Sequence, residues 1–140
     1  MRPQPATPAG RSGRRLATGR LGEQAAAEHL RRRGFEILAR NVRTAAGEID
    51  LVAAAASTIA FVEVKTTRRV ARGGAGEPVE PPFERLGPRQ RRRLRSLALE
   101  WLRAARSPGR GAEEVRFDAI GVVLDASGRL VALEHLEGAF

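Results

Sequence analysis

Apolar residues recur along this chain with two different spacings, and the alternation between them predicts a mixed α/β protein. A helical spacing runs from Thr18, a suitable N-cap, to Arg33, and Gly34 follows as a helix stop. A second helical spacing begins at Pro88, a residue that is favoured at the first helical position. Both spacings predict a helix that buries one apolar face.

The other apolar segments are alternating or rich in β-branched residues, and they predict five strands. The expected strands span residues 35–42, 48–53, 58–66, 115–124 and 129–136. The turn sequence at 125–128 joins the last two and predicts a hairpin. The order of one helix, three strands, one helix and two strands predicts a mixed five-stranded sheet flanked by two main helices.

The segments outside these elements indicate one folded domain at residues 18–140, which is long enough for one core and too short for two. Residues 1–17 are rich in proline, glycine and arginine without apolar periodicity, which predicts a disordered basic tail. Residues 68–87 are rich in glycine and proline, and we interpret them as a mobile loop.

The composition narrows the partners of the chain. The formal net charge is +9 and the isoelectric point about 11.6, which favours a polyanion: nucleic acid, an anionic membrane surface or an acidic protein. The absence of cysteine excludes disulfides, thiol nucleophiles and cysteine-ligated metal sites. No apolar stretch approaches the ~20 residues that cross a bilayer, and no secretory signal is visible, so we expect a cytoplasmic protein without a membrane partner.

Three charged residues lie on two predicted strands that are otherwise apolar. Asp50 is predicted on one face of the second strand, opposite to Ile49 and Leu51. Glu63 and Lys65 share one face of the third strand, and Lys65 is the only lysine among 25 basic residues. Because separately buried charges are costly, we expect these three side chains to pair or to bind a metal.

If the second and third strands form a hairpin, Asp50 and Glu63 converge on one ion. Two carboxylates, the main-chain carbonyl of Val64 and water form an oxygen-rich site that suits Mg²⁺ or Mn²⁺ rather than Zn²⁺. Such an ion polarises a phosphodiester and activates a bound water, and Lys65 could orient that water or stabilise charge on the phosphate. A simple salt bridge between Lys65 and either acid is the alternative interpretation.

The first predicted helix adds an acid to this group. Glu23 falls in the apolar stripe of the helix, together with Ala26, Ala27 and Leu30. We expect its carboxylate to lie within ~8 Å of the two strand carboxylates, as a third acid or through a bound water. The alternative is a capping or dipole role at the helix start, with the side chain in solvent.

Basic residues crowd the start of the second helix, where the helix dipole disfavours cations. This placement makes them candidates for nucleic-acid contacts: Arg89, Gln90, Arg91, Arg92, Arg93 and Arg95. A solvated arginine-rich face is the alternative. His29 and His135 show no ligand spacing, and the sequence assigns them no role.

Several motifs carry a family resemblance. The segment Gly47-Glu-Ile-Asp-Leu-Val52, followed by Phe61-Val-Glu-Val-Lys65, resembles the PD-(D/E)XK signature of restriction-endonuclease-like folds. More closely, the chain resembles the YraN family of bacterial proteins, which are similar to archaeal Holliday-junction resolvases. The resemblance covers 19–140 and includes Gly22-Glu-Gln24, Pro88-Arg-Gln90, Arg116-Phe-Asp118 and Gly138-Ala-Phe140.

The resemblance implies a restriction-endonuclease-like fold in which Asp50 and Glu63 are metal ligands and Lys65 is the catalytic lysine. Glu23 would be the helix-borne acid of resolvase-like members. Ile49 stands where the wider superfamily often has proline, which is usual for this subgroup.

The first hypothesis is therefore a metal-dependent, structure-selective endonuclease that acts on branched or distorted nucleic acid, with DNA favoured over RNA. A homodimer would suit a four-way junction. The second hypothesis is a nucleic-acid-binding module that keeps the nuclease fold without turnover, and a third is a protein whose arginines bind an acidic partner. Three converging charges favour the enzyme, because a binding module does not need them.

Overall fold

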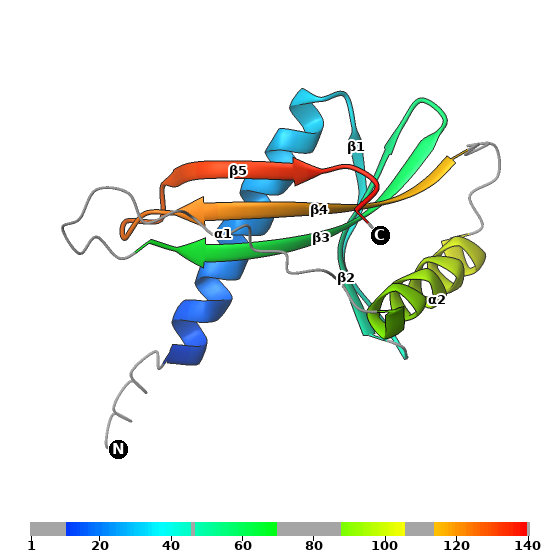
Figure 1. Cartoon of the computed structure of the whole chain (residues 1–140), viewed down its shortest axis with the longest axis horizontal. Helices are drawn as coiled ribbons and strands as arrows, with labels where there is room; N and C mark the ends of the chain where they lie inside the picture. Colours follow the sequence, from blue (N-terminus) through cyan, green and yellow to red (C-terminus); the bar gives the residue numbers. More distant parts are fainter. Residues whose placement is uncertain (1–10, 46, 70–87, 106–113, 140) are drawn as a thin grey trace, which may run out of the picture.

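The computed structural model describes residues 11–45, 47–69, 88–105 and 114–139. These residues form two helices and five strands in the expected order (Figure 1). The elements are α1 (Arg11–Arg32), β1 (Glu36–Thr44), β2 (Gly47–Ala55), β3 (Thr58–Arg68), α2 (Pro88–Ala105), β4 (Glu114–Leu124) and β5 (Leu130–Leu136). The predicted mixed α/β class and the start of the second helix are confirmed.

The five strands form one mixed sheet in the order β1-β2-β3-β4-β5. Only β3 and β4 are parallel; the other neighbouring pairs are antiparallel. A parallel pair needs a long connection, and the segment between β3 and β4 contains α2. The last two strands form the predicted hairpin.

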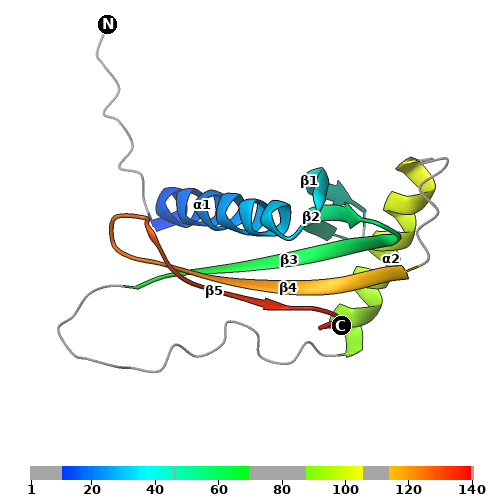
Figure 2. The same ribbon diagram turned by 90° about the horizontal axis from the view of Figure 1, so that it is seen from above.

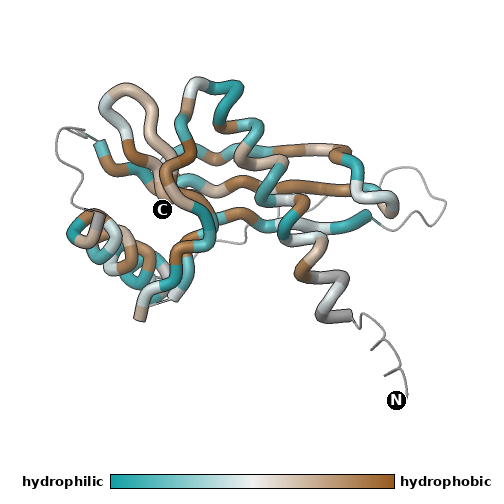
Figure 3. The backbone as a smooth tube through the Cα atoms, turned by 180° about the vertical axis from the view of Figure 1, so that it is seen from behind, coloured by the Kyte–Doolittle hydropathy of each residue, from teal (hydrophilic) through white to brown (hydrophobic). Residues whose placement is uncertain are grey.

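The two helices pack in separate clusters on opposite faces of the sheet. Figure 2 shows α1 along β3, β4 and β5, and α2 at one end of these strands. On one face, Ala26, Ala27 and Leu30 of α1 are completely buried against β2, β3 and β4. On the other face, Leu97 and Ala98 of α2 pack over the β1–β2 end of the sheet. The alternation of polar and apolar residues along α1 and the apolar stretches of the central strands are visible in Figure 3. The predicted apolar stripes of both helices are therefore confirmed.

The strand β2 pairs with β3 along only part of its length. Its pairing with β1 continues to Thr44–Gly47, whereas its pairing with β3 ends at Leu51–Val62. The start of β2, residues 47–50, therefore pairs with β1 alone. Figure 1 shows the β1–β2 pair curving across the direction of the other three strands.

This separation overturns one expectation about strand faces. Ile49 and Leu51 do not share a face: Ile49 packs in the α2 cluster and Leu51 in the α1 cluster. The simple alternation fails because β2 loses its β3 neighbour between the two residues, and a two-stranded ribbon twists more strongly than a full sheet.

The expected start of the first helix was wrong as well. The helix α1 begins at Arg11, so Thr18 lies inside it and the helix includes residues 11–17 of the predicted basic tail. Arginine, leucine and alanine are good helix formers, which outweighs the lack of an apolar stripe in this segment. The rest of the predicted tail, residues 1–10, lies outside the described residues.

The strand β3 extends to Arg68, two residues beyond its expected end, and residues 70–87 of the predicted mobile loop lie outside the described residues. Within the described part of the chain, neither helix has the length and apolarity that a bilayer-crossing segment requires.

Candidate functional site

The separation of β2 from β3 places Asp50 at the centre of the candidate site. Directly after the last β2–β3 pair, the main-chain N–H of Val64 donates a hydrogen bond of 2.7 Å to Asp50 Oδ2. The Asp50 carboxylate thus takes the position where a carbonyl of β2 would continue the ladder. It is held on β3 by a backbone contact, which fixes its direction.

Asp50 and Glu63 line one small pocket of about 60 Å³, although they come from different strands. The pocket lies where β2, β3, β4 and α2 meet, and its lining residues are Glu48, Ile49, Asp50, Phe61, Val62, Glu63, Leu94 and Phe117. Its wall is largely apolar, because most of the other lining residues belong to the cluster beneath α2. Asp50 and Glu63 therefore border the same pocket.

The electrostatics of the pocket disfavour two uncompensated carboxylates. Burial raises the pKa of Asp50 to about 6, and the Val64 hydrogen bond only partly opposes this effect. The neighbouring charges of Glu23, Glu63 and Glu48 raise it further. Burial also raises the pKa of Glu63, against the opposing charges of Lys65 and Arg93. A bound cation would relieve this repulsion.

Glu23 approaches the site from α1 because a glycine lets the helix touch the sheet. A Cβ atom on Gly22 would stand 2.7 Å from Cβ of Thr66 on β3, so only glycine fits at this crossing. The next residue, Glu23, is half-buried, and its charge acts on Asp50. The alternative of a solvent-facing cap is not what the structure shows, since Glu23 lies well inside α1.

Gly22 is a site residue that pattern reasoning did not single out by itself. A glycine inside a helix costs ~1 kcal/mol relative to alanine, so its presence there is a signal of close packing. Which neighbour requires the glycine cannot be read from the helix alone.

Lys65 is exposed and lies two residues after Glu63 on β3. It forms no ion pair with Asp50 or Glu63 in the described structure, although its charge lowers the pKa of Glu63. The interpretation as a simple salt bridge is therefore wrong. The ammonium group remains available at the edge of the carboxylate pair.

The six arginines of α2 are all exposed. Five of them lie in the first half of the helix: Arg89, Arg91, Arg92, Arg93 and Arg95. The guanidinium of Arg93 lies against Gly47 at the start of β2, where a Cβ would stand 2.7 Å from Nε. Arg93 therefore reaches towards the carboxylate pair, in agreement with its effect on Glu63. Gln90 is part of α2, but its side chain lies outside the described residues.

The donor groups fit a hard divalent cation with few protein ligands. Asp50 accepts only the Val64 hydrogen bond and Glu63 accepts none from the described residues, so carboxylate oxygens are free to bind. The Val64 carbonyl points to the same side of β3 as its N–H, towards the gap beside β2.

No group of three or more His, Cys, Asp or Glu side chains in the described residues is arranged to hold a metal ion. Glu23 is therefore not a third direct ligand in this structure. Two carboxylates, one carbonyl and several waters are a composition that Mg²⁺ and Mn²⁺ accept.

Comparison with known proteins gives a consistent result over nearly the whole chain. The family model of the uncharacterised protein family UPF0102 matches residues 22–122. A UPF0102 protein of Nocardia farcinica is 42% identical over 136 residues, which cover 96% of this chain and 98% of the relative. One of Acidothermus cellulolyticus is 41% identical over 139 residues, with 94% and 99% coverage. The matched residues 22–122 include both strand carboxylates, Glu23, Lys65 and the α2 arginines.

Proposed function

Since the chain belongs to the uncharacterised protein family UPF0102, the YraN family that its motifs indicated, we propose that it is a metal-dependent, structure-selective endonuclease. Its substrate would be branched or distorted nucleic acid, in which it hydrolyses phosphodiester bonds. The observation that carries the proposal is the meeting of Asp50 and Glu63 in one pocket at the point where β2 leaves β3. Neither acid forms an ion pair with a described residue, and the exposed Lys65 lies on the same strand as Glu63.

The carboxylates of Asp50 and Glu63 and the carbonyl of Val64 would hold Mg²⁺ or Mn²⁺. Such an ion, when bound, polarises the phosphodiester and lowers the pKa of a coordinated water. Asp50 supplies negative charge at neutral pH, because its pKa, although raised, stays at about 6. The Val64 hydrogen bond keeps Asp50 in one orientation, so the site does not need to reorganise on binding.

Lys65 would act on the phosphate. A compact ammonium that projects from the same strand as Glu63 can donate hydrogen bonds to a non-bridging oxygen and stabilise the charge that develops there. Glu23 would act from the α1 side by accepting a hydrogen bond from a water near Asp50. Both roles require that the spacing between α1 and β3 set by Gly22 is kept.

Nucleic acid is the proposed partner because of the net charge of +9 and the exposed arginines on α2. Arg89 lies one helix turn before Arg93, and the charge of Arg93 acts on Glu63. A phosphate backbone bound along these arginines would therefore reach the pocket. Phosphate contacts of this kind bind and orient without reading sequence. The preference for branched DNA rests on the resemblance to Holliday-junction resolvases, and a homodimer would offer two symmetric sites.

A cleavage assay on a panel of substrates tests the proposal. Labelled four-way junctions, forks, flaps, linear duplexes and single strands, as DNA and as RNA, are incubated with Mg²⁺, Mn²⁺ or EDTA. We expect incision of at least one branched substrate by the wild type with metal only. Asp50→Asn and Glu63→Gln should abolish it, whereas Glu28→Gln, on the exposed side of α1, should not.

Binding of the same substrates without cleavage under any metal condition would contradict the enzyme. That result would favour a binding module that retains the nuclease fold. Cleavage that persists in Asp50→Asn would show that another part of the chain, or a contaminant, carries the activity.

A further inference from the structure

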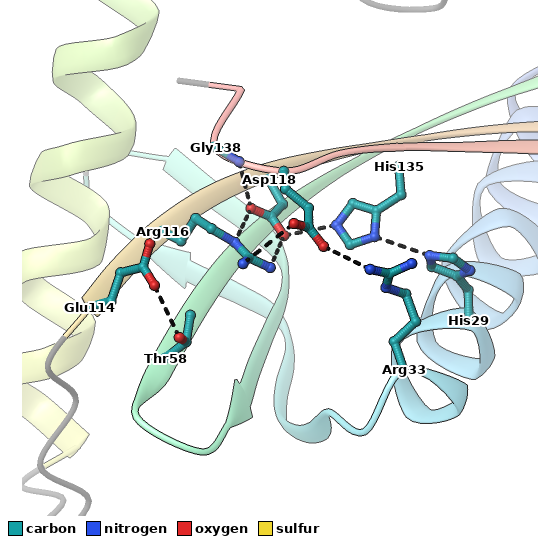
Figure 4. Close-up of polar contacts among 9 residues, drawn as sticks. His29, Arg33, Thr58, Glu114, Arg116, Asp118, His135 and Gly138 are labelled. Atoms are coloured by element: carbon teal, nitrogen blue, oxygen red, sulfur yellow. Dashed lines mark hydrogen bonds and ion pairs between the residues drawn. The ribbon is translucent and has the colours of Figure 1, made fainter.

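The only two histidines of the chain lie together, although 106 residues separate them. His29 on α1 and His135 on β5 approach with Nε2 of His29 3.0 Å from Nδ1 of His135 (Figure 4). Their rings meet edge to face, with centroids 5.1 Å apart. Both rings lie on the α1 side of the sheet, away from the α2 side, and neither belongs to the candidate site.

A buried carboxylate continues this contact into the sheet. Nε2 of His135 lies 2.8 Å from Asp118 Oδ2, and Asp118 is completely buried on β4. The same carboxylate accepts two hydrogen bonds from the Arg116 guanidinium, at 2.8 and 2.9 Å, and one from the Gly138 N–H at 3.0 Å. Burial alone would raise the pKa of Asp118, but the hydrogen bonds from His135, Arg116 and Gly138 lower it.

The ionised Asp118 determines where the protons of the two rings lie. A carboxylate only accepts hydrogen bonds, so Nε2 of His135 carries a hydrogen and a neutral His135 leaves Nδ1 bare. That bare nitrogen accepts a hydrogen bond from Nε2 of His29. If His135 gains a proton instead, its Nδ1–H donates to a neutral His29, and the contact persists with one charge.

A second proton destroys the contact. With both rings protonated, two N–H groups face each other across the 3.0 Å separation, and two positive charges repel. The hydrogen bond between the two rings therefore exists when neither ring or only one ring is protonated, and it is lost when both rings are protonated.

Burial and the neighbouring positive charges oppose a proton on His29. The charged groups that face it from the described elements are Arg32 and Arg33 on α1, Arg116 and Asp118 on β4, and Glu137 after β5. Glu137 is itself engaged, at 3.1 Å from Arg33 and 3.7 Å from Arg116. Burial lowers the pKa of His29, and the charges of His135, Arg33 and Arg32 lower it further.

We propose that the His29–His135 pair is an acid-sensitive latch, which holds the C-terminal half of α1 on the sheet and releases it when both rings are protonated. The latch joins α1 to β5 and, through Asp118, to β4 and the segment at Gly138 (Figure 4). It does not depend on the proposed endonuclease activity. Release would loosen the same helix that positions Glu23 over β3, so acid would also disturb the candidate site.

A titration of the wild-type protein tests the proton count directly. Because the chain has only two imidazoles, ¹⁵N NMR resolves each ring nitrogen over a pH series. At neutral pH we expect the Nδ1 of His135 to show the shift of a nitrogen without hydrogen, and His29 to gain its proton below the ordinary pH of about 6.5. Two rings that titrate independently at about 6.5, with no hydrogen-bonded nitrogen pair, would overturn the proposal.

A non-titrating substitution tests the consequence for stability. Glutamine can place an amide near the position of Nε2, so His29→Gln should keep the contact with His135 and lose its pH dependence. The native state of the wild type binds fewer protons than the unfolded state in the range below ~6.5, so it loses stability as the pH falls. We therefore compare the unfolding constant of the wild type with that of His29→Gln. We expect their ratio to rise by up to ~10-fold for each pH unit by which the pH is lowered in this range.

The comparison between the two proteins cancels the opposite contribution of Asp50, which both retain. Glu28→Gln, an exposed neighbour on the same helix, serves as control and should follow the wild type. Hydrogen exchange at residues 29–35, corrected for intrinsic rates, should become faster at low pH in the wild type and not in His29→Gln. Parallel pH profiles of the wild type and His29→Gln would refute the latch. If His29→Gln does not fold, the wild-type NMR titration decides alone.

Discussion

Replacing Asp50 by asparagine should stabilise the protein in the absence of metal, although it removes the centre of the candidate site. Asparagine has nearly the same shape, and its carbonyl oxygen can still accept the hydrogen bond from the Val64 N–H. The substitution removes only the charge, which is half-buried beside Glu63 and has no cationic partner within hydrogen-bond distance in the described residues. Carboxylates placed together to bind a cation lower the stability of the native protein while the cation is absent.

The pKa of Asp50 gives the size and the sign of this effect. Its rise from 3.8 to about 6 on folding corresponds to ~3 kcal/mol that the charged form costs the native state. Because the side chain is partly exposed, solvent screening reduces the expected gain to ~1–2 kcal/mol. A raised native pKa means that the favourable contribution is complete below pH 3.8 and is lost as the pH rises through about 6.

Urea unfolding of the wild type and Asp50→Asn, in EDTA at pH 4 and pH 7.5, measures this difference. We expect equal stability at the lower pH and a more stable variant at the higher pH. Mn²⁺ should then stabilise the wild type in proportion to its binding and leave Asp50→Asn unchanged. Asp125→Asn is the control of opposite sign, since hydrogen bonds from Ser127 and Arg129 lower the pKa of Asp125.

A variant that is less stable than the wild type in EDTA at pH 7.5 would refute the reasoning. It would mean that other interactions in the native protein stabilise the ionised Asp50 carboxylate, so that its charge does not need a bound cation.

Three further predictions follow from contacts around the site. Gly22→Ala should lose ~1–3 kcal/mol in urea unfolding, because its Cβ meets Thr66, whereas Gly19→Ala, with nothing within 4 Å, should gain up to ~1 kcal/mol. Arg93→Gln should raise the pKa of Glu63 in an NMR titration and should reduce cleavage more than Arg91→Gln does. Arg91→Gln should only weaken nucleic-acid binding and reduce the slope of log K against log salt by ~1. Equal effects of the two variants would contradict the separate position of Arg93. Lys65→Arg should retain nucleic-acid affinity in a binding titration and lose cleavage, and full activity would disprove its special role.

The elements of this fold, and the position of Asp50 close to Glu63, follow from local patterns. Helical spacing places Ala26, Ala27 and Leu30 on one buried face whatever they pack against, because the period of the helix is a property of its own backbone. Strand alternation likewise places Glu63 and Lys65 on one side of β3. A hairpin between β2 and β3 follows from the short turn between two strands, and it brings Asp50 near Glu63.

Local patterns failed where a segment depended on its neighbours. Ile49 changed face because the start of β2, before Leu51, has no β3 neighbour, and a two-stranded ribbon twists more strongly than a full sheet. The helix start moved to Arg11 because propensity extended the helix beyond its apolar stripe. Neither outcome can be read from a short window of sequence.

Only the tertiary structure decided which side chains meet. The glycine at position 22 is required by Thr66, which lies on a different element, whereas Gly47 is favoured by its own backbone, whose φ of 142° other residues rarely adopt. His29 and His135 have no spacing that relates them, yet they share a hydrogen bond, because α1 crosses β4 and β5 on one face of the sheet. Sequence periodicity reports which way a residue points from its own backbone. The crossing of two elements depends on how all of their buried faces pack together, and this crossing determines what the residue meets.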